Sequence, residues 1–165
     1  MKTTIDAHSH MPQGKHPLDN IPTRVEDLVD FDMQTLLNGM DELGIAIVVS
    51  LAQEMTRVRS QWIGSNELAA DLQARFGGRF VGIAGFEPLT PKDQFNAQRF
   101  EEVRELVRVR RVSGLLITPP YGHFKLNDRR AYPFYQMAVE HDVPIYVHQG
   151  AMFGTPENTP QYGGS

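Results

Sequence analysis

The sequence contains no cysteine among its 165 residues. Disulfide bonds and thiolate zinc sites are therefore excluded, so a bound metal ion must be held by histidine and carboxylate side chains. The sequence also lacks any run of about 18 apolar residues, the length that spans a membrane, and residues 1–6 lack the apolar core of a signal peptide. From these absences we expect a cytoplasmic protein without a membrane partner.

An excess of positive charge is absent as well. Lysine and arginine total 16 against 20 acidic residues, which gives a formal net charge of -4. An acidic surface does not attract nucleic acid, so we expect a small-molecule substrate and no nucleic-acid partner. With 41% hydrophobic residues, the chain has enough material for one domain over residues 1–150, and we expect residues 151–165 to form a loop-like tail.

Two histidines end the first strand-like stretch, Thr3 to His10. Side chains at i and i+2 leave an extended chain from the same face, so His8 and His10 project side by side. Two neighbouring imidazoles suit one metal ion, although the same spacing also arises by chance on a solvated strand. A second strand-like run, residues 143–148, also ends in a histidine, His148. If the two strands lie parallel in one sheet, all three imidazoles emerge at its carboxyl edge.

Helix-forming and strand-forming segments alternate along the chain. Apolar spacing predicts helices over residues 32–43, 66–76, 95–110 and 133–141, between strands near residues 3–8, 45–49, 80–84, 115–117 and 143–148, and a polar loop over 53–61. Such alternation is typical of an α/β fold with parallel strands and right-handed crossovers. The connections after the strands are long and those after the helices are short, as in a barrel whose active site lies on the loops after the strands.

Several motifs resemble a known family. They are the segment Ile5 to His10, Met40 to Ile45, Gly78 to Gly82, and Tyr132-Pro133 leading to Pro144 to His148. The first resembles the first-strand metal motif of the amidohydrolase superfamily. The wider pattern, from Thr4 to about Gly150, resembles the amidohydrolase-related branch that includes aminocarboxymuconate-semialdehyde decarboxylase and resorcylate-type decarboxylases.

This resemblance implies a (β/α)8 barrel with one catalytic divalent ion, usually zinc and sometimes manganese. His8 and His10 would be first-strand ligands and His148 the fifth-strand ligand. The family also uses a histidine after the sixth strand as acid/base and an aspartate after the eighth as ligand, and this sequence has neither. A complete barrel takes about 250 residues. We therefore predict a parallel TIM-barrel-type fold truncated after about five strands. Its open sheet edges favour a homo-oligomer or association with a missing barrel half.

Other polar residues near these strand ends are candidates with two readings each. Asp6 shares the face of His8 and could orient an imidazole as an outer partner of the metal site, or could bond the neighbouring backbone. His123 and Tyr121, on the long loop after the fourth strand, are candidate substrate contacts or loop residues exposed to solvent, and so is His16. No catalytic acid/base residue can be named.

The resulting prediction is a metal-dependent hydrolase of the amidohydrolase type. Three imidazoles and a water molecule form a workable tetrahedral zinc site in which the water is activated toward a small carbonyl substrate. One alternative is the non-oxidative decarboxylation of a small aromatic or unsaturated carboxylic acid. A second alternative is an inactive, truncated or self-associating fragment.

Overall fold

The computed structural model of this chain describes residues 4–11, 16–17, 19–28 and 31–149, so the tail predicted over residues 151–165 lies outside the described part. In chain order its elements are β1 (Thr4–Ser9), β2 (His16–Pro17), η1 (Val25–Asp27), α1 (Met33–Leu43), β3 (Ile45–Leu51), β4 (Gln53–Met55), α2 (Thr56–Arg59), β5 (Gln61–Ile63), α3 (Asn66–Arg75), β6 (Phe80–Phe86), α4 (Ala97–Arg108), β7 (Gly114–Ile117), α5 (Pro119–Gly122), η2 (Arg129–Ala131), α6 (Tyr132–Glu140) and β8 (Ile145–Val147).

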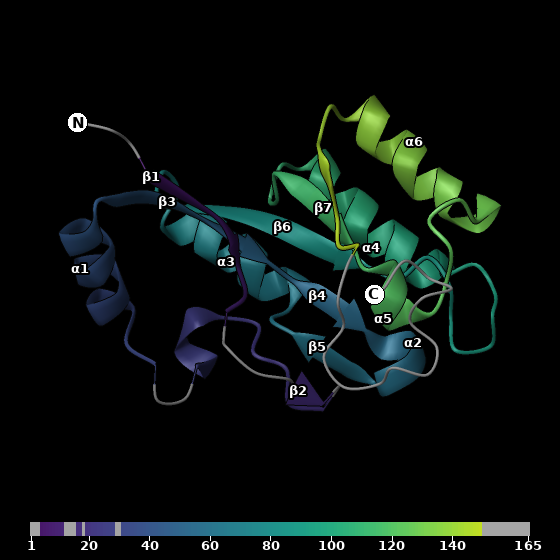
Figure 1. Ribbon diagram of the computed structural model, residues 1–165, viewed down its shortest axis with the longest axis horizontal. Coiled ribbons are helices and arrows are strands. Elements are labelled where there is room, and N and C mark those ends of the chain that lie inside the picture. Colours follow the sequence, from purple (N-terminus) through teal and green to yellow (C-terminus); the bar gives the residue numbers. More distant parts are fainter. Residues whose placement is uncertain (1–3, 12–15, 18, 29–30, 150–165) are drawn as a thin grey trace.

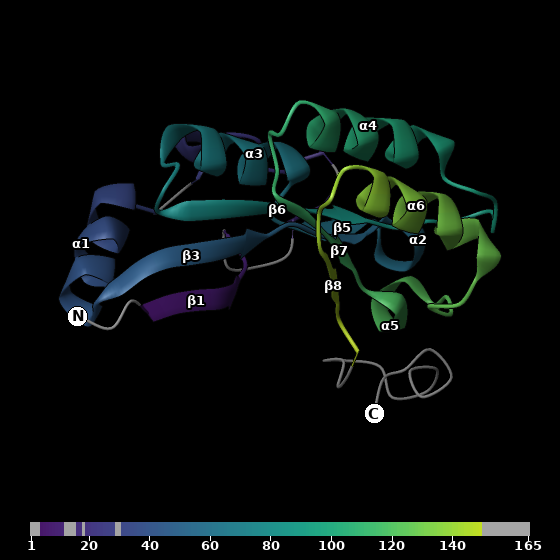
Figure 2. The same cartoon turned by 90° about the horizontal axis from the view of Figure 1, so that it is seen from above.

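Five strands form the main sheet in the order β1-β3-β6-β7-β8. Every pair of neighbours in it is parallel. The order follows the chain, so each strand lies beside the next one and the sheet curls into a half-barrel (Figures 1 and 2). The prediction of a TIM-barrel-type fold truncated after about five strands is confirmed. All five carboxyl ends lie at one edge of the sheet.

Helices cover one face of this sheet. Figure 2 shows α3, α4 and α6 lying along it, and α1 packs with α3 against β3 and β6 in one hydrophobic cluster. The contact between α3 and β6 is close, because a Cβ atom on Gly82 would lie 2.4 Å from the carbonyl oxygen of Ala69. Only glycine fits at this point.

The opposite face, which is the inner face of the half-barrel, carries its own apolar cluster. Its buried members are Val49, Leu51, Ile83 and Leu116. On β3, Val48 belongs to the helix-covered side and Val49 to the inner side, as the alternation of side chains along a strand requires. Burial on both faces explains the unbroken apolar runs of these strands.

A small antiparallel sheet lies beside the carboxyl ends of the main strands (Figure 1). Its order is β2-β5-β4. The prediction of a polar loop over residues 53–61 is therefore wrong, because this segment contains β4, α2 and part of β5, and Gln53, Glu54 and Met55 are all buried. Glu54 is buried because distant residues, Arg99 and the backbone N–H of Glu87, provide its polar partners.

The helix ends follow local sequence signals. Asp32 caps α1 by accepting hydrogen bonds from the N–H groups of Gln34 and Thr35, and Gly44 ends the helix in the left-handed region with φ 68°. Ser65 caps α3 in the same way. None of the helices in the described ranges is both long enough and apolar enough to cross a membrane.

Both outer flanks of the half-barrel expose apolar side chains. We define the first flank as β1 and α1, where Ile5 is 53% and Leu43 74% exposed, and Leu43 lines a cavity of about 280 Å³. The second flank is β8 and α6, where Val147 is 43% and Val139 82% exposed. An open surface hollow of about 480 Å³ lies along α6, and the described residues that line it all belong to that helix. Within the described residues, β1 and β8 each pair with one strand only, so both flanks end in an open sheet edge.

Candidate metal centre

The two histidines of the N-terminal motif meet at the carboxyl end of β1. The Nε2 atoms of His8 and His10 lie 3.1 Å apart, and their ring centroids are separated by 5.0 Å. Two imidazole nitrogens bound to one zinc ion at about 2.0–2.1 Å lie about 3.0–3.4 Å from each other, depending on the coordination angle. The pair therefore has the spacing of two ligands of a single divalent ion, and the same distance allows a hydrogen bond between the two rings in the absence of metal.

A backbone carbonyl orients the second of these rings. Nδ1 of His10 lies 2.9 Å from the carbonyl oxygen of Leu51, the last residue of β3. A carbonyl only accepts, so Nδ1 carries the proton and the neutral ring presents its Nε2 lone pair toward His8. Burial lowers the pKa of His10, and the nearby His8 and His148 act in the same direction, against the hydrogen bond to Leu51. A neutral, oriented imidazole is the form that binds a metal ion.

The third histidine lies at the same edge. His148 follows β8 directly, and its main-chain N–H donates to the carbonyl oxygen of Ile117 at 2.9 Å. Its ring centroid is 6.3 Å from that of His8, whereas two imidazoles on one tetrahedral ion are about 5 Å apart. In the described ranges, no group of three or more histidine, aspartate or glutamate side chains is placed to hold a metal ion. His8 and His10 are thus paired at ligand spacing, and His148 lies beside them.

Of the predicted substrate contacts, the structure brings Tyr121 to this edge. Its ring lies 5.3 Å from that of His148 at 65°. His123 ends α5 in the left-handed region with φ 51°, and burial, with the charges of Arg57 and Arg59, lowers its pKa. The backbone of His16 pairs with Trp62 in the small sheet, but its side chain lies outside the described part of the structure.

Asp6 contacts the main chain of the motif. Its Oδ1 accepts a hydrogen bond from the backbone N–H of His8 at 3.1 Å, and its side chain is exposed. The contact to neighbouring backbone is the second of the two readings given to this residue above. The carbonyl of Leu51, which the sequence analysis did not consider, is the group that orients an imidazole.

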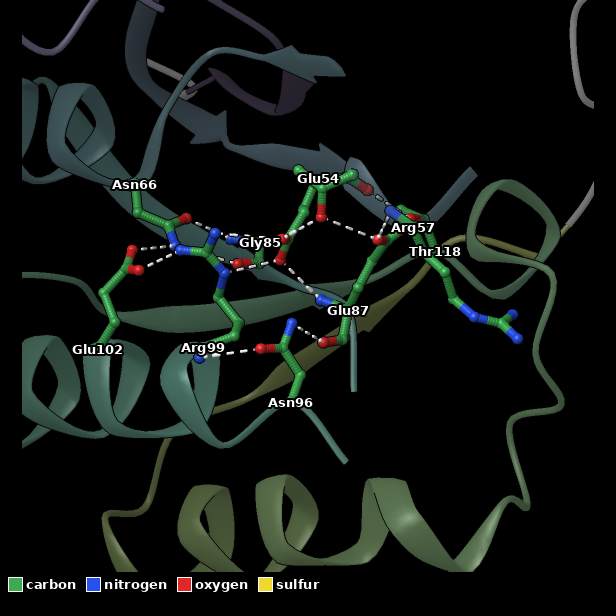
Figure 3. A network of polar contacts seen from close by, with 10 residues as sticks. Glu54, Arg57, Asn66, Gly85, Glu87, Asn96, Arg99, Glu102 and Thr118 are labelled. Atoms are coloured by element: carbon green, nitrogen blue, oxygen red, sulfur yellow. Dashed lines mark hydrogen bonds and ion pairs between the residues drawn. The ribbon is translucent and has the colours of Figure 1, made fainter. Parts of the chain in front are cut away.

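A buried polar network behind this edge was also missed (Figure 3). Glu54, in β4, is 2% exposed, and Glu87, directly after β6, is 0% exposed. The hydroxyl of Thr56 lies 2.6 Å from Oε1 of Glu54 and 3.1 Å from Oε2 of Glu87, and the backbone N–H of Arg57 donates to that same oxygen of Glu87. An acidic residue directly after a strand of an α/β sheet, as Glu87 is, was the available signal.

Arg99 joins this network from α4. Its Nε lies 2.8 Å from Oε2 of Glu54, its Nη1 pairs with Glu102, and its guanidinium stacks 4.6 Å from the ring centroid of Trp62. Burial raises the pKa of Glu54, and burial together with the charge of Glu54 raises the pKa of Glu87 to about 8. Because Arg99 faces Glu54, we assign the ionised form to Glu54 and the proton to Glu87 at neutral pH.

Comparisons with known proteins identify a family for this chain. The family model described as amidohydrolase matches residues 5–163. Among curated proteins, no sequence matches the chain significantly.

Three solved structures with the same fold carry different activities in their descriptions. A 4-oxalomesaconate hydratase from Rhodopseudomonas palustris has 20% identity and a TM-score of 0.58 over 88% of this chain and 52% of its own. A probable 2-pyrone-4,6-dicarboxylic acid hydrolase from Acinetobacter baumannii has 15% identity and a TM-score of 0.54 over 90% and 50%. A 5-carboxyvanillate decarboxylase from Novosphingobium aromaticivorans, with bound manganese, has 20% identity and a TM-score of 0.54 over 76% and 36%.

At these identities the solved structures establish the fold alone. The chain spans about half the length of the first two structures. The family model, by contrast, matches nearly the whole chain, and its match includes the strand ends that carry the three histidines. The chain belongs to the amidohydrolase family.

Proposed function

We propose that this chain provides the histidine ligands of a divalent-metal site in an amidohydrolase-type enzyme. His8 and His10 would hold the ion together with His148. The observation that carries the proposal is the 3.1 Å separation of the Nε2 atoms of His8 and His10, with His10 oriented by the carbonyl of Leu51. A chance pair of solvated histidines would not need a partner that fixes the ring. Zinc is the proposed ion and manganese the alternative.

The proposed reaction is hydrolysis of a small carbonyl compound. A divalent ion held at this edge would supply Lewis acidity toward the carbonyl and a water molecule of lowered pKa. Tyr121, in α5, and His123, at the end of that helix, are the proposed substrate contacts, since Tyr121 packs beside His148. His16 remains a third candidate. We name no acid/base residue.

The fold alone admits more than one reaction. The solved structures described above carry the activities of a hydratase, a hydrolase and a decarboxylase. We retain decarboxylation of a small aromatic or unsaturated acid as the alternative, and an inactive fragment as the third case. Hydrolysis and decarboxylation differ in their products, because only decarboxylation releases carbon dioxide.

The test is an assay of the purified chain, stripped with a chelator and reloaded with zinc or manganese. Small carboxylated esters, lactones and phenolic acids are the substrates, and both acid release and carbon dioxide are measured. The proposal predicts metal-dependent acid release that His8→Ala abolishes. His141→Ala should leave it unchanged, because His141 precedes β8 and so lies at the end of that strand opposite to His148. Release of carbon dioxide without hydrolysis would reject the proposed hydrolysis in favour of decarboxylation. Turnover that does not depend on the metal would reject both reactions.

We further propose that a second copy of the chain covers the two flanks. Each flank combines an open parallel strand edge with exposed apolar side chains, including Leu43 on the first flank and Val139 on the second. When β8 of one copy lies against β1 of another, the parallel sheet continues and both apolar surfaces are buried. Such a contact joins two different surfaces, so it closes a ring or extends a chain of copies.

A further inference from the structure

One arginine connects the three segments that follow successive strands of the half-barrel. Arg57 lies in α2, and its Nη1 donates to the carbonyl oxygens of Gly122, at 2.6 Å, and His123. Its Nη2 pairs with Oδ1 of Asp93 at 2.8 Å. Gly122 and His123 follow β7, and Asp93 follows β6. The Arg57 side chain is only 16% exposed, so its contacts with the two carbonyl oxygens are partly buried, whereas Asp93 is 61% exposed.

The backbone of Arg57 is itself fixed. Its N–H donates to the buried carboxyl of Glu87, and the hydroxyl of the preceding residue, Thr56, bonds the same network. The guanidinium therefore extends from an anchored point toward α5. A side chain anchored at both ends fixes the distance between the segments that it joins, more firmly than a solvated arginine does.

The segment held in this way carries the ring next to His148. A short helix such as α5 leaves carbonyl groups without intrahelical partners at its carboxyl end. Arg57 donates hydrogen bonds to two of these carbonyls, those of Gly122 and His123. His123 is in the left-handed region although it is not glycine, so the surroundings must hold this turn. Tyr121, within α5, is buried and lies 5.3 Å from the His148 ring.

We infer that Arg57 is a positioning residue for the metal centre, because it holds α5 so that Tyr121 fixes the ring orientation of His148. The inference rests on the proposed function only in treating His148 as a ligand. Arg59 also contacts the Tyr121 ring, with its guanidinium 5.8 Å from the ring centroid, and the test leaves that contact in place. A merely structural role for Arg57 would change stability without changing the environment of His148.

The first readout needs no metal. The imidazole C–H signals of His148, assigned with His148→Ala, are recorded by NMR on the metal-free protein, where the facing Tyr121 ring shifts them. Arg57→Gln is expected to move these signals, since α5 loses its clamp. Arg130→Gln is the matched control, because Arg130 also pairs with Asp93, while its other ion pair is with Asp128, which lies outside α5. Unchanged His148 signals in Arg57→Gln would overturn the inference.

The second readout is zinc affinity, measured by competition with a chelator. Loss of a group that orients a ligand commonly weakens metal binding about tenfold or more, so Arg57→Gln should show this loss and Arg130→Gln should not. If Arg57→Gln does not fold, Arg57→Lys, which keeps the charge and one carbonyl contact, should give a smaller change in the same direction. A wild-type protein that binds no zinc would reject the proposed function, while the NMR comparison would still decide the role of Arg57.

Discussion

The backbone N–H of Glu87 donates a hydrogen bond to Oε2 of Glu54 over 2.8 Å, so two buried carboxyl groups belong to one network. Glu54 faces Arg99 across an ion pair of 2.8 Å. Within the described residues, Glu87 has no ion-pair partner, and its Oε1 has no hydrogen-bond partner. Burial of a carboxyl without a facing cation favours its protonated form. The charge state of Glu87 therefore links the stability of the site to pH.

The unfolding free energy should fall as pH rises from about 5 to 8. The pKa of Glu87 is raised from 4.5 to about 8 in the fold, so in this range the folded protein binds more protons than the unfolded chain. The contribution of Glu87 to stability is complete below the pKa that this carboxyl has in the unfolded chain, and it is lost as the pH rises to the pKa of about 8 that it has in the fold. For one proton the loss is at most about 1.4 kcal/mol per pH unit. Urea unfolding at several pH values measures this slope.

Glu87→Gln is the variant that assigns the slope. It keeps the shape of the protonated carboxyl but cannot ionise, so the dependence of unfolding free energy on pH should become flatter. Glu101→Gln, on the exposed side of α4, should leave the slope unchanged. A Glu87→Gln protein with the wild-type slope would show that another group carries the effect.

Arg99→Met should destabilise the fold strongly. Removal of one partner leaves Glu54 charged and buried, which typically costs about 3–5 kcal/mol, and the stacking on Trp62 is lost as well. Arg104→Met removes an exposed pair with Glu101 and should cost no more than about 1 kcal/mol. Chemical unfolding of both variants gives the comparison, and similar losses in the two would contradict a buried, stabilising role for Arg99.

Lysine on either flank should weaken self-association. Leu43→Lys and Val139→Lys place a charge on surfaces that the second copy would cover, so both should shift sedimentation velocity profiles toward the monomer. Val109→Lys, which changes an exposed apolar residue after α4 and outside both flanks, is the control. A wild-type chain that remains monomeric at every concentration would rule out the association.

The sequence was sufficient for the main sheet and the histidine edge because their signals are local. The run Ile45 to Val49 is apolar on both faces because β3 is covered on both faces. Gly44 ends α1 in the left-handed region, as its position predicted. The i, i+2 spacing of His8 and His10 places their rings on one face of a strand, and the structure has them there.

The small sheet and the buried network were not predictable in the same way. Glu54 is polar, and polarity in a window of sequence indicates exposure. Its ion-pair partner, Arg99, is 45 positions away, and its other contacts come from Thr56 and Glu87. Only the folded chain brings these groups together, so the segment over residues 53–61 looked like a loop. The orienting contact between His10 and Leu51 escapes sequence reasoning for the same reason, since it uses a backbone carbonyl.

The measurement that tests the metal centre most directly is the zinc and manganese content of the purified chain by elemental analysis, beside His8→Ala, His148→Ala and His141→Ala. We expect about one ion per chain in the wild type and in His141→Ala, and loss of the ion in the other two variants, because β1 and β8 end at the same edge. An ion that is retained in His8→Ala, or a wild-type chain that binds none, would contradict the proposed site.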